Sequence, residues 1–288
     1  MLSRRLVRFS LLLTVLVFAA LAVFAGCGDD DEEDGGGGGG KIDVSGVPEV
    51  TDGKLTIGSD IAYAPVEYYE EGTQNATGLD VDLAKALATA LGVEVEFKQV
   101  ADFSGIVGDL KVKRYDIVMS AISITPTREA EIAFVPYFGP VGTGILTPKG
   151  NPDNFAKLED LCGHKVAAQV GTYQVDQVGV LNDGACKADP IDLTTFPDNP
   201  ASVQELSVGR VEAQLADDPV VAYNAAQSDG KLEVAATGFE SATYGIGVRK
   251  DSPELKAALE KALKQIRDDG TYDQVLKKWG QEEFALKP

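Results

Sequence analysis

In the body of the chain, short apolar segments alternate with segments that have the period of an amphipathic helix. Residues 54–59 (KLTIGS) have the composition of a strand, and residues 93–100 (VEVEFKQV) alternate with period two. Between them, residues 78–92 (GLDVDLAKALATALG) place apolar side chains on one helical face and end at Gly92, a common helix stop. Residues 115–122 (YDIVMSAI) are typical of a buried strand. This succession predicts an α/β protein with a mostly parallel sheet covered by helices.

A second series of strand-like and helix-like segments begins near residue 145 (ILTPK) and ends in two amphipathic segments, 253–270 and 271–280. A body of this length exceeds what one compact core usually holds, so we expect two α/β lobes. Ligands of such sheets bind beyond the carboxyl ends of the strands, and here also in the cleft between the lobes. The fold class by itself does not specify a function.

The first 26 residues carry the features of a secretory signal: three arginines, an apolar run (Leu11–Phe24) and the small residues Ala25–Gly26. Cys27 follows, and the segment FAGC resembles the lipobox of bacterial lipoproteins, which implies a diacylglyceryl group on Cys27 after cleavage. An uncleaved membrane anchor is the alternative, because the apolar run is near the lower limit for spanning. Residues 27–52 contain an acidic block and six consecutive glycines, and we expect a flexible tether.

The charge of the chain is strongly negative. Residues 1–26 hold three basic and no acidic residues, so their removal would change the formal net charge from -19 to -22. An acidic surface argues against nucleic acid or another phosphate-rich partner. Together with the signal and Cys27, this charge indicates an extracytoplasmic protein that the lipid on Cys27 holds at the cell membrane. We also expect a monomer.

Cys162 and Cys186 are the remaining cysteines. An even pair in an exported chain predicts a disulfide, and two buried free thiols are the alternative. The chain has one histidine and no cysteine–histidine cluster, so we expect neither a metal site nor a cofactor.

Residues 120–129 (SAISITPTRE) place an arginine where a helix should begin. Thr125 followed by Pro126 is a strong helix-start signal, with a hydroxyl cap before the first turn. Arg128 would then lie at the amide end of the helix, where a cation is mildly unfavourable. A solvated surface arginine would explain this residue, and so would a site that holds an anion.

Six segments, in this order, resemble the motifs of bacterial extracellular solute-binding protein family 3, which serve polar amino-acid ABC transporters: IGSDIAYAPVEYY, GLDVDLAKALA, YDIVMSAISITPTRE, AAQVGTYQ, EAQLADDPVVAY and YGIGVRKD. The resemblance covers about Lys54–Trp279. It implies a two-lobe, periplasmic-binding-protein-like type II fold, with each lobe a mostly parallel sheet flanked by helices. Residues 53–142 plus 239–288 would form lobe 1 and residues 143–238 would form lobe 2. The lobes would close on the ligand like a hinged trap.

The resemblance also implies a role for individual residues. Arg128 would bind the ligand's α-carboxylate with both ends of its planar fork, helped by the backbone N–H of Ser123. From the other side of the cleft, Thr172 and the backbone of Tyr173 would complete this carboxylate site. Asp217 would take the α-ammonium group.

Other residues of the same motifs would surround the rest of the ligand. The hydroxyl of Ser123 and the carbonyl of Ala121 would join Asp217 on the ammonium group, and Tyr63 and Phe103 would pack on the ligand's side chain. Three polar residues lie where the family tunes specificity: Asp60, Ser120 and Gln169. Their polarity suggests a polar or cationic side chain on the ligand.

Structural roles are the alternatives for several of these residues. Asp217 could be the N-cap of a helix that begins before Pro219, and Thr172 could cap the helix that follows it. Tyr63 and Phe103 could be ordinary core aromatics. A binding site is nevertheless favoured, because a cation, an anion and aromatic side chains together match the outline of an α-amino acid.

Three functions follow from these observations. The first is a substrate-binding component of an ABC transporter, a binder without catalysis whose partners are a free amino acid and the permease subunits. The second is an exported dehydratase of the same fold acting on prephenate or arogenate, which would need a general acid and a second cation for a dicarboxylate. The third is a sensory ectodomain, which would need a separate signalling partner.

Overall fold

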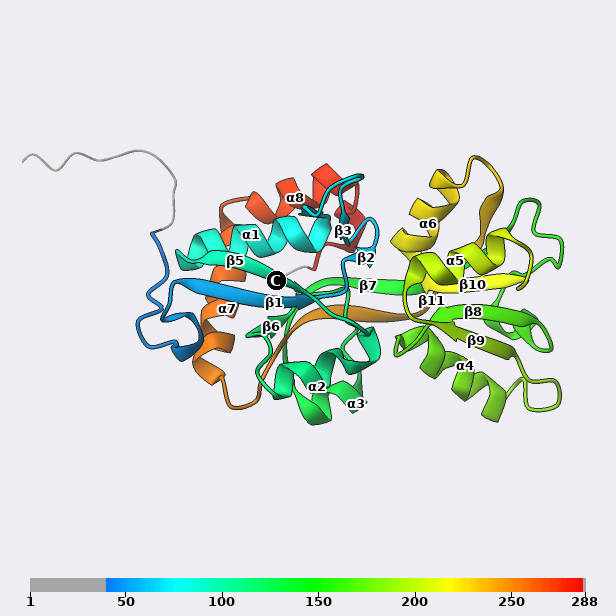
Figure 1. The fold of residues 1–288 in the computed structure, drawn as a ribbon, viewed down its shortest axis with the longest axis horizontal. Helices are drawn as coiled ribbons and strands as arrows, with labels where there is room; N and C mark the ends of the chain where they lie inside the picture. Colours follow the sequence, from blue (N-terminus) through cyan, green and yellow to red (C-terminus); the bar gives the residue numbers. More distant parts are fainter. Residues whose placement is uncertain (1–39, 287–288) are drawn as a thin grey trace, which may run out of the picture. The chain divides into compact units, whose positions relative to one another are not determined.

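A computed structural model describes residues 40–286 of the chain (Figure 1). Within these residues the chain forms eleven strands and eight α-helices, in the alternation that the sequence predicts. The strands are β1 (Lys54–Ser59), β2 (Ala62–Tyr63), β3 (Glu67–Tyr69), β4 (Ala76–Thr77), β5 (Glu94–Gln99), β6 (Ile117–Val118), β7 (Ala133–Pro148), β8 (Lys165–Gln169), β9 (Asp192–Phe196), β10 (Ala213–Asp217) and β11 (Leu232–Val248). The helices are α1 (Leu79–Leu91), α2 (Ile106–Lys111), α3 (Pro126–Glu131), α4 (Tyr173–Asp183), α5 (Asn199–Ser207), α6 (Asp218–Gln227), α7 (Pro253–Asp268) and α8 (Thr271–Trp279).

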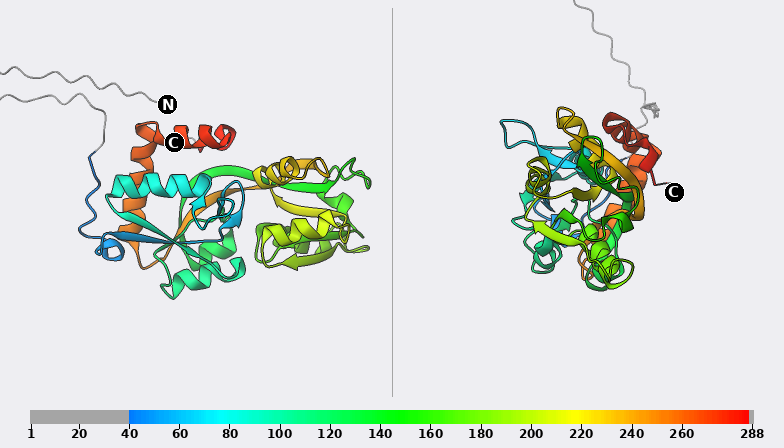
Figure 2. Two further views of the ribbon diagram at one scale, coloured as in Figure 1. Left: turned by 45° about the horizontal axis from the view of Figure 1, so that its top comes forward. Right: turned by 90° about the vertical axis from the view of Figure 1, so that its right-hand side faces the viewer.

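Eight strands form one sheet in the order β5-β1-β6-β11-β7-β10-β8-β9. The strands β5, β1 and β6 are parallel to one another, and so are β10, β8 and β9. Between these two groups lie the long strands β7 and β11, which pair antiparallel. In Figures 1 and 2 these two strands run from one lobe to the other, and helices flank the strands in both lobes. The predicted fold class is therefore confirmed, whereas the division into 53–142 plus 239–288 and 143–238 stays a prediction.

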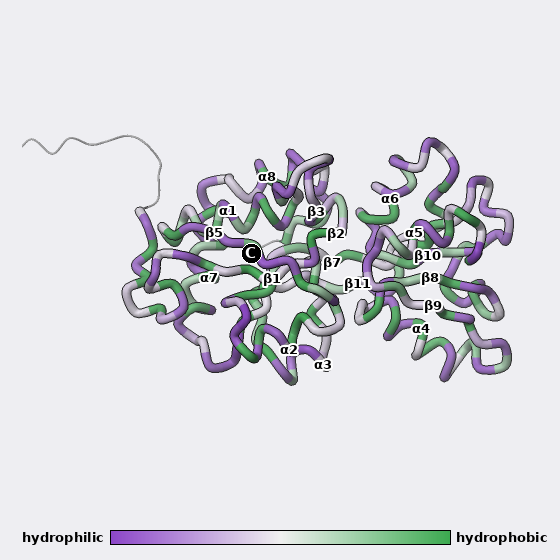
Figure 3. The backbone as a smooth tube through the Cα atoms, in the orientation of Figure 1, coloured by the Kyte–Doolittle hydropathy of each residue, from purple (hydrophilic) through white to green (hydrophobic). Residues whose placement is uncertain are grey.

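Helix α1 illustrates how the hydrophobic pattern produces the packing. Its predicted apolar residues are all buried: Val81, Leu83, Ala84, Leu87 and Leu91. Gly92 ends the helix with φ 71°, and its N–H bonds the carbonyls of Ala88 and Thr89. Figure 3 shows the same principle on a larger scale, because hydrophobic segments follow the strands while hydrophilic segments gather on the outer loops and helix faces.

A small second sheet was not predicted. It consists of β2, β3 and β4, each two or three residues long and paired antiparallel. Strands this short carry no readable period. Gly78 lets the chain pass from β4 into α1, because a Cβ at this residue would come 2.2 Å from the carbonyl oxygen of Val66 and its φ is 129°. The sheet matters because it carries Tyr63 and Glu67 to the space between the lobes.

The strand predicted at residues 115–122 is shorter than expected. The structure ends β6 at Val118, and the chain then turns through Ala121, whose φ is 46°. Side chains from elsewhere hold this turn: the Ser120 hydroxyl accepts from the Asp60 N–H, and the Ala121 N–H donates to Asp80. These bonds remove the backbone from the sheet and place residues 120–123 beside the cavity described below.

The predicted disulfide between Cys162 and Cys186 is present. The residues predicted to form the signal, including the lipidation site Cys27, lie outside the described part of the chain. The helices within residues 40–286 are too short or too polar to span a lipid bilayer.

Reduction of this disulfide is expected to lower the free energy of unfolding by about 3 kcal/mol, because the bond restricts the unfolded chain across 24 residues. Urea unfolding with and without a reductant measures the difference. The double variant Cys162→Ala/Cys186→Ala is the control, since a reductant should not change its stability. Thiol counting on the unreduced protein should find neither cysteine, and two reactive thiols would contradict the bond.

Candidate functional site

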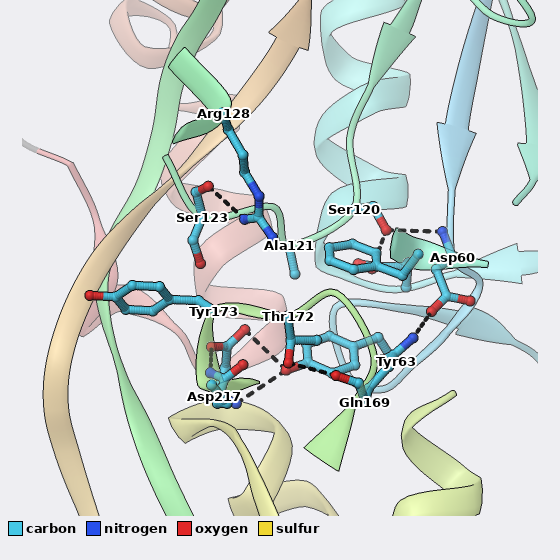
Figure 4. Close-up of a pocket in the computed structure, with 13 residues that line it drawn as sticks. Asp60, Tyr63, Ser120, Ala121, Ser123, Arg128, Gln169, Thr172, Tyr173 and Asp217 are labelled. Carbon is cyan, nitrogen blue, oxygen red and sulfur yellow. Dashed lines mark hydrogen bonds between the residues drawn. The ribbon is translucent and has the colours of Figure 1, made fainter. Parts of the chain in front are cut away.

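A cavity lies between the two lobes, lined by residues from both. It is lined by Asp60, Tyr63, Glu67, Phe103, Ser120, Ala121, Ser123, Arg128, Gln169, Thr172, Tyr173, Gln174 and Asp217. All eleven residues that the sequence assigns to a ligand are in this set. Figure 4 labels ten of them, on elements of both lobes, and shows the Tyr173 ring directed away from the others. Glu67 and Gln174 are additions.

Arg128 reaches this cavity from a very short helix. The N-cap of α3 is Thr125, whose hydroxyl accepts from the Arg128 N–H at 3.3 Å, as the sequence predicts. The guanidinium group donates to the Ser123 carbonyl at 2.7 Å and, in the other lobe, to the Gly171 carbonyl at 2.9 Å. It also lies 5.7 Å from the centre of the Phe103 ring. Burial lowers the pKa of Arg128, but arginine stays protonated in proteins. The arginine is therefore a largely buried cation without a bonded carboxylate among the described residues.

The two lobes come very close at Gly171, beside this arginine. A Cβ at Gly171 would be 2.5 Å from the Cα of Ser104, and the φ of Gly171 is 75°. Only a glycine permits this approach of the two backbones. Further hydrogen bonds cross between the lobes nearby, from Gln169 to Asp60 and from Tyr63 to Asp217.

Asp217 ends β10 and stands at the N-cap position of α6, but its side chain makes no cap bond. Its carboxylate instead accepts from the hydroxyls of Tyr244 at 2.6 Å and Tyr63 at 3.1 Å, and from the amide of Gln174 at 2.8 Å. Burial raises the pKa of Asp217 to about 6, although these three hydrogen bonds act in the opposite direction. Within residues 40–286, this carboxylate has hydrogen-bond donors but no bonded cation.

The neighbouring carboxylate, Asp218, has a different position. Its two oxygens accept from the N–H groups of Gly142 in β7 and Gly238 in β11, at 3.2 Å and 3.1 Å. It therefore ties helix α6 to the two strands that connect the lobes. The two adjacent aspartates therefore have different positions: the Asp217 side chain faces the cavity, and the Asp218 side chain faces the connecting strands.

Asp60, Gln169 and Ser120 form one side of the cavity. The Gln169 amide donates to Asp60 at 2.5 Å, and the Gln99 amide donates to the other Asp60 oxygen at 3.2 Å. The Asp60 N–H donates to the Ser120 hydroxyl at 2.9 Å. Burial raises the pKa of Asp60, and the two amide bonds lower it. Asp60 is 6% exposed and has no cation among these partners.

The remaining predicted residues complete the wall. Thr172 is at the N-cap position of α4, yet its hydroxyl donates to the Gln169 carbonyl at 2.8 Å and makes no cap bond. Tyr173 is the first residue of α4, and Ser123 forms an isolated bridge with Tyr244. Phe103 is 8% exposed, so it is a buried side chain that also faces the cavity.

Sequence reasoning missed Glu67 and Gln174. Gln174 lies in the AAQVGTYQ segment, in the first turn of α4. A buried glutamine is a weak indication of a ligand-binding residue, and the position of Gln174 in this motif could have strengthened the indication. Glu67 is in the short strand β3, where no period marks its burial.

Among the residues that line the cavity, one is a cation and three are carboxylic acids. The arrangement can neutralise a small zwitterion, with the carboxylate on Arg128 and the ammonium group on Asp217.

Comparison with known proteins places the chain in a family. Residues 55–282 match the bacterial extracellular solute-binding proteins, family 3. The L-cystine-binding protein TcyJ of Escherichia coli (strain K12) is 28% identical over 79% of this chain and 82% of its own length. The arginine-binding extracellular protein ArtP of Bacillus subtilis (strain 168) is 33% identical over 78% of this chain and 86% of its own length.

A solved structure extends the comparison. The ancestral amino acid-binding protein AncCDT-1, a precursor of cyclohexadienyl dehydratase, has a TM-score of 0.68 and 36% identity over 82% of this chain and 99% of its own. The match to the family covers most of the chain and includes every element that lines the cavity. The chain belongs to the bacterial extracellular solute-binding proteins, family 3.

Proposed function

We propose that this chain binds a free amino acid with a cationic side chain between its two lobes, as the substrate-binding component of an ABC transporter. The observation that carries the proposal is the pair of buried, opposite charges in one cavity: Arg128 on one side and Asp217 on the other. A zwitterion is the small molecule that would neutralise both at once. Hydrogen bonds to charged groups contribute about 1.5–3 kcal/mol each.

The ligand's main-chain groups would replace contacts that the protein now makes with itself. The α-carboxylate would take the Arg128 donors that now meet the Ser123 and Gly171 carbonyls, together with donors from Thr172 and Tyr173. The α-ammonium group would lie on Asp217, with the Ser123 hydroxyl and the Ala121 carbonyl. Tyr63 and Phe103 would pack against the ligand from both sides.

The charge of the cavity supports a cationic side chain. Arg128 and Asp217 balance the two charges of a zwitterion, so the carboxylate of Asp60 is left without a counter-charge. Asp60 is buried, and its present partners are neutral amides. A cationic ligand group near Asp60, Ser120 and Gln169 would remove this imbalance. The arginine-binding relative is consistent with this choice, whereas the cystine-binding relative has a ligand of different charge.

We also propose how the protein is located. Residues 1–26 would direct export, and the lipid on Cys27 would hold a monomer outside the cytoplasm at the cell membrane. In the proposed tether 27–52, Val47 and Val50 are buried in the hydrophobic core of the body, so the residues before them would let the body reach the permease subunits. The finding that supports this is the match to an extracellular family, because its members work outside the cytoplasm. Lobe 1 would comprise 53–142 plus 239–288, and lobe 2 would comprise 143–238.

The alternative function is a dehydratase acting on prephenate or arogenate, and two observations bear on it. One relative is a precursor of cyclohexadienyl dehydratase, and Glu67 supplies a buried carboxylic acid in the cavity. A dicarboxylate substrate, however, would need a second cation, and Arg128 is the only cation among the described residues that line the cavity. Asp217 would also repel one of the two carboxylates. We therefore propose a binding protein that is not an enzyme.

A thermal-shift screen with the twenty amino acids tests this function. A ligand at 1,000 times its Kd stabilises the folded state by about 4 kcal/mol, which raises the Tm of a body of this size by about 8–16 °C. L-arginine and L-lysine should give the largest shifts, and neutral and acidic amino acids smaller ones. Equal melting temperatures with all twenty would refute the proposal. Turnover of prephenate or arogenate to an aromatic product would instead favour the enzyme.

A further inference from the structure

Two carboxylic acids meet beneath the cavity. Glu67 lies in β3 and Asp80 in the first turn of α1, and they are 1% and 0% exposed. The Asp80 N–H donates to the carbonyl of Val66, the residue before Glu67, at 2.9 Å, and the two carboxyl groups bond the adjacent residues Ser120 and Ala121. Two carboxylates buried side by side cannot both be ionised without a counter-charge, so the arrangement requires a proton on one of them. The Oε2 atom of Glu67 is buried and has no hydrogen-bond partner among the described residues, which makes it the natural place for that proton.

The remaining oxygens of the pair hold the segment that borders the ligand site. The Ser120 hydroxyl donates to Glu67 Oε1 at 2.9 Å and accepts from the Asp60 N–H. The Ala121 N–H donates to Asp80 Oδ2 at 2.9 Å, and the Tyr137 hydroxyl donates to Asp80 at 2.7 Å. The φ of Ala121 is 46°, a conformation that a non-glycine residue adopts only when its surroundings fix it. The pair provides this fixation.

The surroundings of the pair favour one negative charge and disfavour two. The titratable groups that face it are Asp60, Asp217, Tyr63 and Tyr137, and none of these is a cation. The positive end of α1 lies at Asp80 and stabilises a single carboxylate. Arg128, which lines the same cavity, is bonded to carbonyl oxygens. A second negative charge would thus meet the first one in a buried space without compensation.

We propose that Glu67 and Asp80 share one proton and act together as a positioning element for the ligand site, holding residues 120–123 in the shape that binds the amino acid. This inference rests on the proposed function, because Ser120, Ala121 and Ser123 belong to the proposed ligand contacts. Glu67 itself is a positioning residue. Its neutral carboxyl group accepts from the Ser120 hydroxyl and lies beside Asp80.

The shared proton gives amino-acid binding an alkaline limit. Burial raises the pKa of Asp80 to about 7, and burial together with the Asp80 charge raises the pKa of Glu67 well above its ordinary value. The pair therefore keeps a proton at neutral pH and loses it at alkaline pH. Loss of the proton places two negative charges against each other, which weakens the anchors on Ser120 and Ala121. Folded-state stability from this pair is lost in the same direction, as pH rises.

Calorimetric titration with L-arginine from about pH 7 to about pH 10 tests the proposal in three proteins. The quantity compared is the ratio of the alkaline Kd to the neutral Kd within each protein, so the ligand's own titration is common to all. Glu67→Gln keeps an uncharged donor and acceptor of the same shape, and its ratio should be about tenfold smaller than that of the wild type. Glu70→Gln is the matched control: the same change at an exposed residue three positions away, with the wild-type ratio expected. Equal ratios in all three proteins would overturn the proposal.

Infrared spectroscopy tests the proton without any ligand. At neutral pH, the difference spectrum between the wild type and Glu67→Gln should contain the C=O stretch of a protonated carboxylic acid. Its absence would overturn the shared proton even if L-arginine binds, and its presence would support the pair even if L-arginine does not. If Glu67→Gln does not fold, a pH titration of this band in the wild type decides the question. The band should persist at neutral pH and disappear at alkaline pH.

Discussion

Arg128→Ala is expected to weaken the binding of L-arginine by about 30- to 5,000-fold while the protein remains folded. Removing one member of a buried, hydrogen-bonded charge pair costs about 2–5 kcal/mol, because the other charge stays desolvated without its partner. Arg128 bonds two backbone carbonyl oxygens, those of Ser123 and Gly171, so the fold does not depend on a charge pair at this position. Calorimetry measures the affinity, and circular dichroism with urea unfolding measures the fold.

Two further variants sharpen this test. Arg128→Lys keeps the charge but loses the planar fork, so it should recover only part of the affinity. Arg114→Ala is the control, because Arg114 is an exposed arginine whose partner is Asp109 on the neighbouring helix α2. Its affinity should equal that of the wild type. An unchanged affinity in Arg128→Ala would remove Arg128 from the site.

Asp217→Asn is expected to have a similar effect on affinity for a different reason. The asparagine amide has the shape of the carboxylate and can still accept from the hydroxyls of Tyr63 and Tyr244, so the local structure is kept. The ammonium group of the ligand, however, loses its counter-charge. We expect a loss of about 100-fold or more. Asp183→Asn, the same change at an exposed residue at the end of α4, should leave the affinity unaltered.

The pH dependence of binding gives a second test of Asp217. Its pKa in the free protein is raised to about 6 by burial, so it is ionised at neutral pH and becomes protonated as the pH falls below about 6. A protonated Asp217 cannot neutralise the ammonium group. Wild-type affinity should therefore fall about tenfold for each pH unit below that value, and this dependence should be much weaker in Asp217→Asn. The same acid dependence in both proteins would assign it to another group.

Much of the fold could be predicted because its elements are long and periodic. Helix α1 shows the apolar positions and the glycine stop that its sequence indicates, and β1 has the predicted bounds. The strands β2, β3 and β4 could not be predicted, since two or three residues do not establish a period. The strand β6 was predicted too long, because the bonds that turn the chain at Ser120 and Ala121 come from residues 41 to 60 positions away.

The residues of the site were predictable from sequence motifs, but the contacts between them were not. The motifs identify Arg128 and Asp217 by type and context, and the structure brings both to one cavity together with the nine other predicted residues. Their bonding partners were not predictable, because a contact such as Tyr63 to Asp217 joins residues 154 positions apart. The bonds from Glu67 to Ser120 and from Asp80 to Ala121, and those from Asp218 to the connecting strands, likewise join residues far apart in the sequence.

A crystal structure of the protein grown with L-arginine would show directly which residues bind each group of the amino acid. We expect the α-carboxylate within about 3.2 Å of the Arg128 guanidinium nitrogens, the α-ammonium group within the same distance of Asp217, and the ligand's guanidinium group toward Asp60. An amino acid bound in the reverse orientation, or bound outside the cavity between the lobes, would contradict the proposed site.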